Sequence, residues 1–175
     1  MAVAAVTYPT ELLRELFAHM EWADAAVWRA ALSHGPAMRD ARLRDLLFHI
    51  HLVQRAFLSV WTDRLTAFPE AGEFEDIAAV RWWGQPVYAE LHTFLESADQ
   101  AALARPVVLP WAVRVAQLGA RSPVSPSLAE TMFQVVSHSI YHRGQATMRL
   151  RELDGTPPLV DFIAWIWFDR PRPEW

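Results

Sequence analysis

The chain has 175 residues, of which 53% are hydrophobic, with no cysteine and a formal net charge of −4. This length and apolar content suit a single domain, residues 1–175, with a sizeable core. The acidic balance, without any basic block, argues against nucleic-acid binding. The lack of cysteine excludes disulfides, a cysteine nucleophile and thiolate metal ligands.

Apolar residues at spacings of three and four predict two long helices in the first part of the chain. The first covers residues 10–33, with Thr10 as its N-cap, and Gly35-Pro36 is expected to end it. The second covers residues 40–65 and has a wide apolar face. An acidic loop with a proline and a glycine follows it.

The middle of the chain predicts a broken helix and then a long connection. Residues 75–103 fit a third helix, interrupted near Gly84-Gln85-Pro86, where the proline suits the first turn of the second piece. Residues 104–126 contain four prolines and predict a loop without a helix. Within it, residues 107–109 and 113–115 are candidates for a short hairpin.

The fourth long helix is predicted over residues 127–154. Ser127 is a suitable N-cap, and Glu130 occupies the capping-box position three residues later. Residues 159–169 predict a short additional helix near the C-terminus. The sequence therefore predicts an all-α protein.

Two histidines mark the fourth helix as a candidate metal site. His138 and His142 lie four residues apart and so share one helix face. Neutral imidazole is a common ligand for zinc, nickel, copper and iron. A third ligand must come from elsewhere, and His49 and His51 are the candidates. These two point about 200° apart on a helical wheel, so periodicity does not decide between them. The pattern is typical of a site between helices of a bundle.

The residues next to the histidine pair lead to further predictions. Gln145 can line the site or support a ligand histidine, and Arg143 can pair with a carboxylate on another helix or face solvent. Gly144, in mid-helix, predicts close packing by another group. The remaining histidines have no partner at ligand spacing and are expected to be structural or exposed; they are His19, His34 and His92.

The segment at residues 138–145 reads His-Ser-Ile-Tyr-His-Arg-Gly-Gln. It is followed by Leu-Arg-Glu-Leu-Asp-Gly-Thr-Pro-Pro at 150–158 and by Asp161. This pattern resembles the signature of the DinB family of metalloenzyme-like proteins. Two weaker segments agree with it. Residues 16–24, which include Trp-Ala-Asp, resemble the family's first helix, and residues 46–50, Leu-Leu-Phe-His-Ile, resemble its second. The resemblance extends over essentially the whole chain.

The resemblance implies a four-helix bundle in up-down-down-up order. It also implies a divalent metal ion, with zinc or nickel favoured and iron or manganese possible, bound by His49, His138 and His142. His49 is chosen over His51 because the His-Ile step, with Gln54 five residues later, aligns there. Family members are often dimers, so a homodimer is expected. Some relatives are transferases that use low-molecular-weight thiols, and others isomerise or hydrolyse.

Three functional hypotheses follow. The leading one is a metal-dependent enzyme acting on a small molecule, either a transferase using a low-molecular-weight thiol or a hydrolase. Candidates for its general base are Tyr141, Gln145 and whichever of His49 and His51 is not a ligand. The second hypothesis is a metal-binding or stress-response protein without catalysis, and the third is a helical scaffold whose histidines bind nothing.

Targeting signals are not evident in the sequence. No apolar stretch reaches the roughly 20 residues that span a bilayer. The N-terminus lacks the basic start and continuous apolar run of a signal peptide. We therefore expect a cytoplasmic protein that does not associate with membranes.

Overall fold

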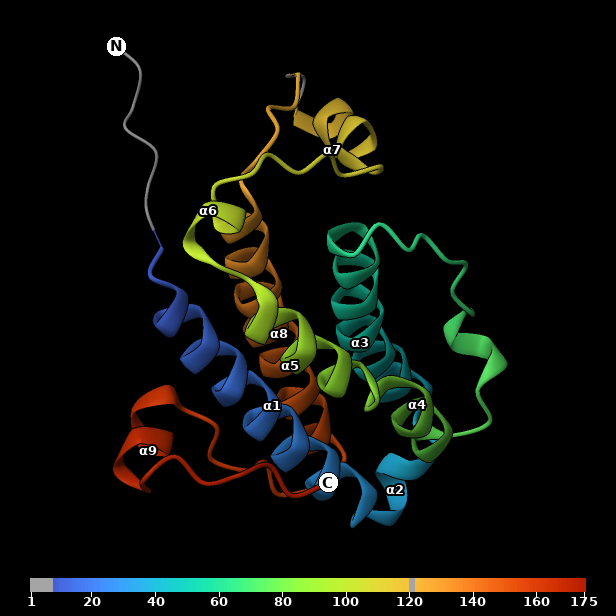
Figure 1. Ribbon diagram of the computed structural model, residues 1–175. Helices are drawn as coiled ribbons and strands as arrows, with labels where there is room; N and C mark the ends of the chain where they lie inside the picture. Colours follow the sequence, from blue (N-terminus) through green and yellow to red (C-terminus); the bar gives the residue numbers. More distant parts are fainter. Residues whose placement is uncertain (1–7, 120–121) are drawn as a thin grey trace.

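The computed structural model describes residues 8–119 and 122–175, and within them every regular element is a helix. The all-α class is thus confirmed, while the up-down-down-up bundle order stays a prediction. The three longest helices are α1 (Thr10–Leu32), α3 (Ala41–Trp61) and α8 (Leu128–Glu152). Both α1 and α3 pack against α8 (Figure 1). The shorter α4 (Ile77–Gly84) and α5 (Val87–Ser97) pack against α3.

The helices α3 and α8 run antiparallel, as three side-chain contacts along them show. Arg149 donates to Asp40 at 2.6 Å near the start of α3, and the rings of His49 and His138 meet in the middle with their Nε2 atoms 3.0 Å apart. At the far end, Trp61 Nε1 donates to Thr131 Oγ1 at 2.9 Å. The pairing brings the two histidine-bearing segments, far apart in sequence, to the same level of the molecule.

Side-chain capping contacts are present at some helix starts and absent at others. The Ser127–Glu130 capping box is present at the start of α8, as predicted. The N-cap of α1 is Pro9 rather than the predicted Thr10, and it makes no side-chain cap bond. The second predicted helix ends at Trp61, not at residue 65. Asp63 adopts a positive φ of 54°, a left-handed conformation that stops a helix.

Glycine and proline act as predicted around α4 and α5, and differently after α1. Pro86 is the N-cap of α5, which confirms the break near Gly84. Gly35-Pro36, in contrast, does more than follow α1: it begins a further short helix, α2 (Gly35–Met38). Proline fits there because the backbone N–H groups of the first helical turn have no hydrogen-bond partner within the helix, so the missing N–H of proline costs nothing.

The prediction that residues 104–126 contain no helix, and the prediction of a hairpin within them, are wrong. After the short α6 (Gln100–Leu103), the chain forms α7 (Ala112–Gly119), which includes residues 113–115. The prolines lie outside 112–119, so nothing there prevents intrahelical hydrogen bonds. Val107 N instead donates to Pro126 O at 2.8 Å. α7 lies at one end of the molecule, away from the long helices (Figure 1).

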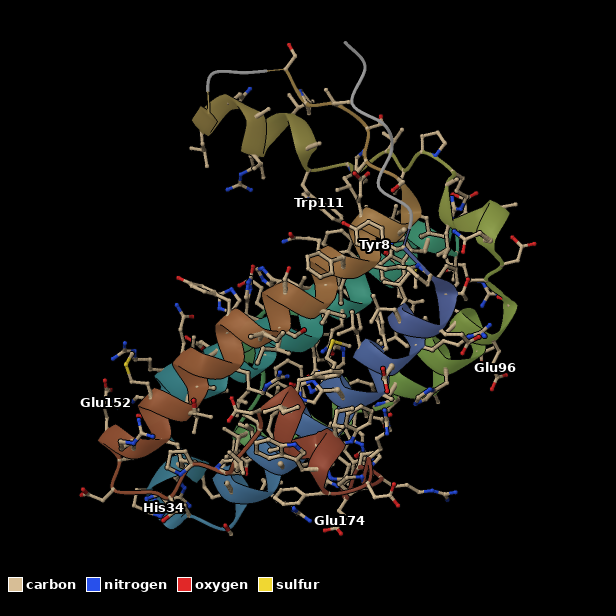
Figure 2. All side chains as sticks on the ribbon, turned by 90° about the vertical axis from the view of Figure 1, so that its left-hand side faces the viewer. Tyr8, His34, Glu96, Trp111, Glu152 and Glu174 are labelled. Atoms are coloured by element: carbon tan, nitrogen blue, oxygen red, sulfur yellow. The ribbon has the colours of Figure 1, made fainter. Side chains whose placement is uncertain are left out.

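After α8 the chain folds back along α1. It passes through α9 (Phe162–Trp167), and Arg170 then pairs with Glu15 of α1 at 2.7 Å. At the end of the chain, Trp175 Nε1 donates to Glu21 Oε1 at 3.2 Å. Figure 2 shows Glu174 and His34 at the same end of the molecule, opposite Tyr8 and Trp111. A single-turn helix, η1 (Ala71–Glu73), lies between α3 and α4.

Two apolar clusters form the core, with a polar layer between them along the long helices. One cluster contains Phe17 of α1, Phe57 of α3 and Val136 of α8. The other contains Val27, Phe48 and Ala146 of the same three helices. Between these levels lie buried polar residues: Asp24, His51, Gln54, Ser139 and Arg143. None of the helices in the described part of the chain is long and apolar enough to span a bilayer.

Two glycines give a matched test of packing. A Cβ on Gly84 would lie 2.2 Å from Cδ2 of the buried His51 ring, whereas a Cβ on Gly144 would meet nothing within 4 Å. The close approach predicted at Gly144 is therefore found at Gly84. We expect Gly84→Ala to lower the free energy of unfolding by about 1–3 kcal/mol through overpacking. Gly144→Ala, in mid-helix, is expected to raise it by about 0.4–1 kcal/mol. Urea denaturation of both variants measures the difference, and a Gly84→Ala protein as stable as Gly144→Ala would contradict it.

Candidate metal centre

Three histidine rings from two helices meet in the groove between α3 and α8. One nitrogen each of His49, His138 and His142 lies within 4.8 Å of the other two, and all three residues are half-buried. The ring centroids of His138 and His142 are 4.3 Å apart, and those of His49 and His142 are 4.4 Å apart. Nitrogens bound at 2.0–2.1 Å to one tetrahedral ion lie about 3.3 Å apart. Small rotations of the rings therefore suffice for the three to share an ion.

Gln145 fixes the tautomer of His142. Its side-chain oxygen Oε1 lies 2.8 Å from His142 Nδ1. An amide oxygen only accepts hydrogen bonds, so Nδ1 carries the proton and donates, leaving the lone pair of Nε2 for a ligand role. This confirms the expectation that Gln145 supports a histidine of the site. Such outer contacts orient the ring and raise the basicity of the ligand.

The surroundings of His49 and His138 favour the neutral form of both rings. Burial, followed by the proximity of His142 and His49, lowers the pKa of His138 to about 4. Burial and the proximity of His142 also lower the pKa of His49. A neutral imidazole has the unshared electron pair that a metal ligand needs. The donor set therefore fits a divalent ion that accepts nitrogen ligands.

The histidine cluster opens onto a pocket of about 550 Å³ between the two helices. Its lining includes His49 and His142 together with Arg42, Asp45 and Leu46 from the preceding turns of α3. Arg42 and Asp45 are both exposed. A small molecule in this pocket would reach the imidazoles from the solvent side.

His51 lies on the opposite side of α3 from the pocket and is fully buried. Trp28 Nε1 donates to His51 Nε2 at 2.9 Å, so His51 Nδ1 carries the proton and donates to Gln54 Oε1 at 2.8 Å. Both ring nitrogens are thus used within the protein. Of the two candidates that periodicity left open, the structure brings His49 to the cluster and places His51 in the core.

The polar layer behind the cluster is one connected hydrogen-bond network. Gln54 Nε2 donates to Asp24 Oδ2 at 2.9 Å and to Ser139 Oγ at 3.3 Å, and the hydroxyl of Tyr88 donates to the same Asp24 oxygen. Arg143 donates to Asp24 Oδ1 at 2.7 Å, and both side chains are almost completely buried. The prediction that Arg143 pairs with a carboxylate of another helix is confirmed.

This network ties the histidine-bearing segments of α3 and α8 to α1. Ser139 follows His138, and Arg143 follows His142, so the same stretch of α8 presents imidazoles to the groove and polar groups to the core. Sequence reasoning missed Asp24, Gln54 and Tyr88 as parts of this arrangement. The available signal was the polar Asp24 within an otherwise apolar stretch of α1, since a buried charge requires a partner.

The other histidines have structural roles in agreement with the sequence prediction. His19 and His34 hydrogen-bond the carbonyl oxygens of Val160 and Leu153, at 3.0 Å and 2.6 Å. His92 Nε2 lies 2.6 Å from Glu21 Oε2. Tyr141, proposed as a general base, packs edge-on against His142 at 5.0 Å between ring centroids and is largely exposed.

The lowered histidine pKa values predict how stability depends on pH in the metal-free protein. In the unfolded chain these histidines titrate near 6.5, whereas in the folded protein His138 titrates at about 4. Between these pH values the unfolded state binds more protons, so the free energy of unfolding rises with pH. We expect stability to fall as the pH is lowered from 6.5 toward 4, and to fall less steeply in His138→Asn. Guanidinium denaturation across this range measures both slopes; identical slopes would contradict the prediction.

Comparison with known proteins agrees with this arrangement. A search of curated proteins found no significant match. The family model of the DinB family matches residues 8–173. These residues include the three clustered histidines and the buried network behind them. Because the match covers nearly the whole chain, this protein belongs to the DinB family.

Proposed function

We propose that this protein is a metal-dependent enzyme that acts on a small electrophilic or hydrolysable molecule. Its divalent ion, zinc or nickel in the first instance, would be held by His49, His138 and His142. The observation that carries the proposal is the convergence of three imidazoles beside an open pocket of about 550 Å³. Three protein ligands leave a position for water or substrate, the arrangement of catalytic rather than structural sites.

A bound ion of this kind lowers the pKa of a water molecule or thiol at its open position to near neutrality. The protein's own side chains orient the histidines and contact the substrate. Gln145 holds the His142 ring in the required tautomer. The Asp24–Arg143 pair fixes α1 against the segment of α8 that carries both histidines. Arg42 and Asp45 line the pocket and are placed to contact polar groups of a substrate. A transferase reaction with a low-molecular-weight thiol and a hydrolysis both fit this arrangement.

The test is activity of metal-loaded protein against two panels, one of electrophiles with a small thiol and one of esters and amides with water. Thiol-dependent loss of an electrophile supports the transferase, and thiol-independent cleavage supports the hydrolase. Turnover in either panel should disappear in His138→Ala. Tight metal uptake without turnover in any panel would instead support a non-catalytic metal-binding protein. If protein purified without a histidine tag takes up no metal, both the enzyme and the non-catalytic metal-binding protein are contradicted.

We further propose that the active form is a homodimer built on a bundle of α1, α3, α5 and α8. The outward face of α8 carries partly exposed apolar side chains at helical spacing, among them Phe133, Ile140 and Met148. Gly144 lies on the same face, and a Cβ added there would meet nothing within 4 Å, which leaves room for a second helix to approach closely. Ile140→Glu should reduce dimerisation in sedimentation equilibrium, whereas Leu118→Glu in α7 should not. A wild-type protein that is monomeric at high concentration would contradict the proposal.

A further inference from the structure

A second pocket, of about 380 Å³, lies on another side of the molecule, where α1, α4, α5 and the end of the chain meet. Its wall is rich in aromatic side chains: Trp82 of α4, Tyr88 of α5 and Trp175. The rings of Tyr88 and Trp175 lie 5.3 Å apart between centroids. Trp82 is 77% exposed at this site. A volume of this size falls within the range of small-ligand sites.

A buried carboxylate belongs to the same pocket. Glu21 is only 8% exposed, yet it lines the pocket. Its oxygens accept from His92 Nε2 at 2.6 Å and from Trp175 Nε1 at 3.2 Å. These two contacts use half of the roughly four acceptor positions of a carboxylate. No arginine of the described residues lies within ion-pair distance of Glu21.

The combination of aromatic walls and a buried carboxylate without a permanent cation defines the ligand chemistry. The faces of aromatic rings attract organic cations, and quaternary ammonium groups are bound in this way. A carboxylate inside a site of low polarity adds attraction for a positive charge and repels anions. We propose that this pocket is a second binding site, for a small ligand with an alkylammonium group. It is separate from the histidine cluster and does not depend on the function proposed there.

The test compares choline with its uncharged carbon analogue, 3,3-dimethylbutan-1-ol, by isothermal titration calorimetry, with the indole N–H resonances of Trp82 and Trp175 as a local readout. Choline should bind at least about tenfold more tightly than the analogue and shift both resonances. Binding should persist in His138→Ala, because the histidine cluster is not involved. Equal affinities would show an apolar pocket without charge selection and overturn the proposal, as would the absence of choline binding.

Two pairs of variants localise the effect. Glu21→Gln should weaken choline binding about tenfold and leave the analogue unchanged, whereas Glu15→Gln, on the same helix, should change neither. Trp82→Ala should weaken choline binding, and Trp167→Ala, which removes a tryptophan exposed to a similar extent on α9, should not. Because Trp82 is largely exposed, its variant is expected to fold normally even if Glu21→Gln is destabilised. Wild-type choline affinity in Trp82→Ala would overturn the proposal.

Discussion

His138→Ala is expected to abolish stoichiometric binding of a divalent ion at micromolar concentrations. The three imidazoles are drawn from two helices, so removal of one leaves a pair that does not enclose an ion. Loss of an outer hydrogen-bond partner costs about 10- to 100-fold in metal affinity. Gln145→Leu should therefore fall in that range, and His138→Ala should exceed it. Isothermal titration with zinc and nickel, supported by elemental analysis, gives the affinities.

The matched control is His34→Ala, which removes a histidine that bonds the carbonyl of Leu153 at the C-terminal end of α8, about three helical turns beyond His142. It should bind metal as the wild type does. If His138→Ala binds with wild-type affinity while the protein remains folded, the cluster is not the metal site. If Gln145→Leu has no effect, the hydrogen bond to His142 does not control the ligand.

Asp24→Asn is expected to destabilise the protein by about 3–5 kcal/mol, because it leaves the buried guanidinium of Arg143 without a counter-charge. The same change also weakens the acceptor for Gln54 and Tyr88. The double variant Asp24→Asn with Arg143→Met should recover part of the loss, since no uncompensated charge then remains. Urea denaturation of the single and double variants measures the coupling.

Glu15→Gln is the control on the same helix, because Glu15 also pairs with an arginine but at the surface. Exposed pairs contribute about 0–1 kcal/mol, so this variant should stay close to the wild type. Asp24→Asn should in addition lower metal affinity, because an uncompensated positive charge beside His142 repels a cation. Equal stability of the two variants would contradict the role assigned to the buried pair.

Periodicity and capping predicted the long helices well because those signals are local. The Ser127–Glu130 box and the break at Pro86 depend on residues within one turn, and both appear in the structure. The helix α7 escapes prediction from proline content, because a proline prevents helix formation only near its own position. Four prolines in 104–126 still leave 112–119 uninterrupted.

The candidate site, too, was predictable from the sequence only where its signals are local. The helical face shared by His138 and His142 follows from their spacing, but the choice of His49 over His51 depended on the family resemblance. Helix geometry alone left the two equivalent, and burial of His51 between Trp28 and Gln54 is a tertiary property. The role of Asp24 was also hidden, because its partner Arg143 is 119 residues away in sequence.

The polar layer between the two apolar clusters also determines how α3 and α8 align. Apolar side chains tolerate a slip of one helical turn, about 5.4 Å, because one aliphatic contact can replace another. The hydrogen bonds from Gln54 to Asp24 and Ser139 have no such substitute. A slipped alignment would leave several buried donors without hydrogen-bond partners at once. The layer therefore stabilises a single register of the helices. The positions of the three imidazoles relative to one another depend on that register.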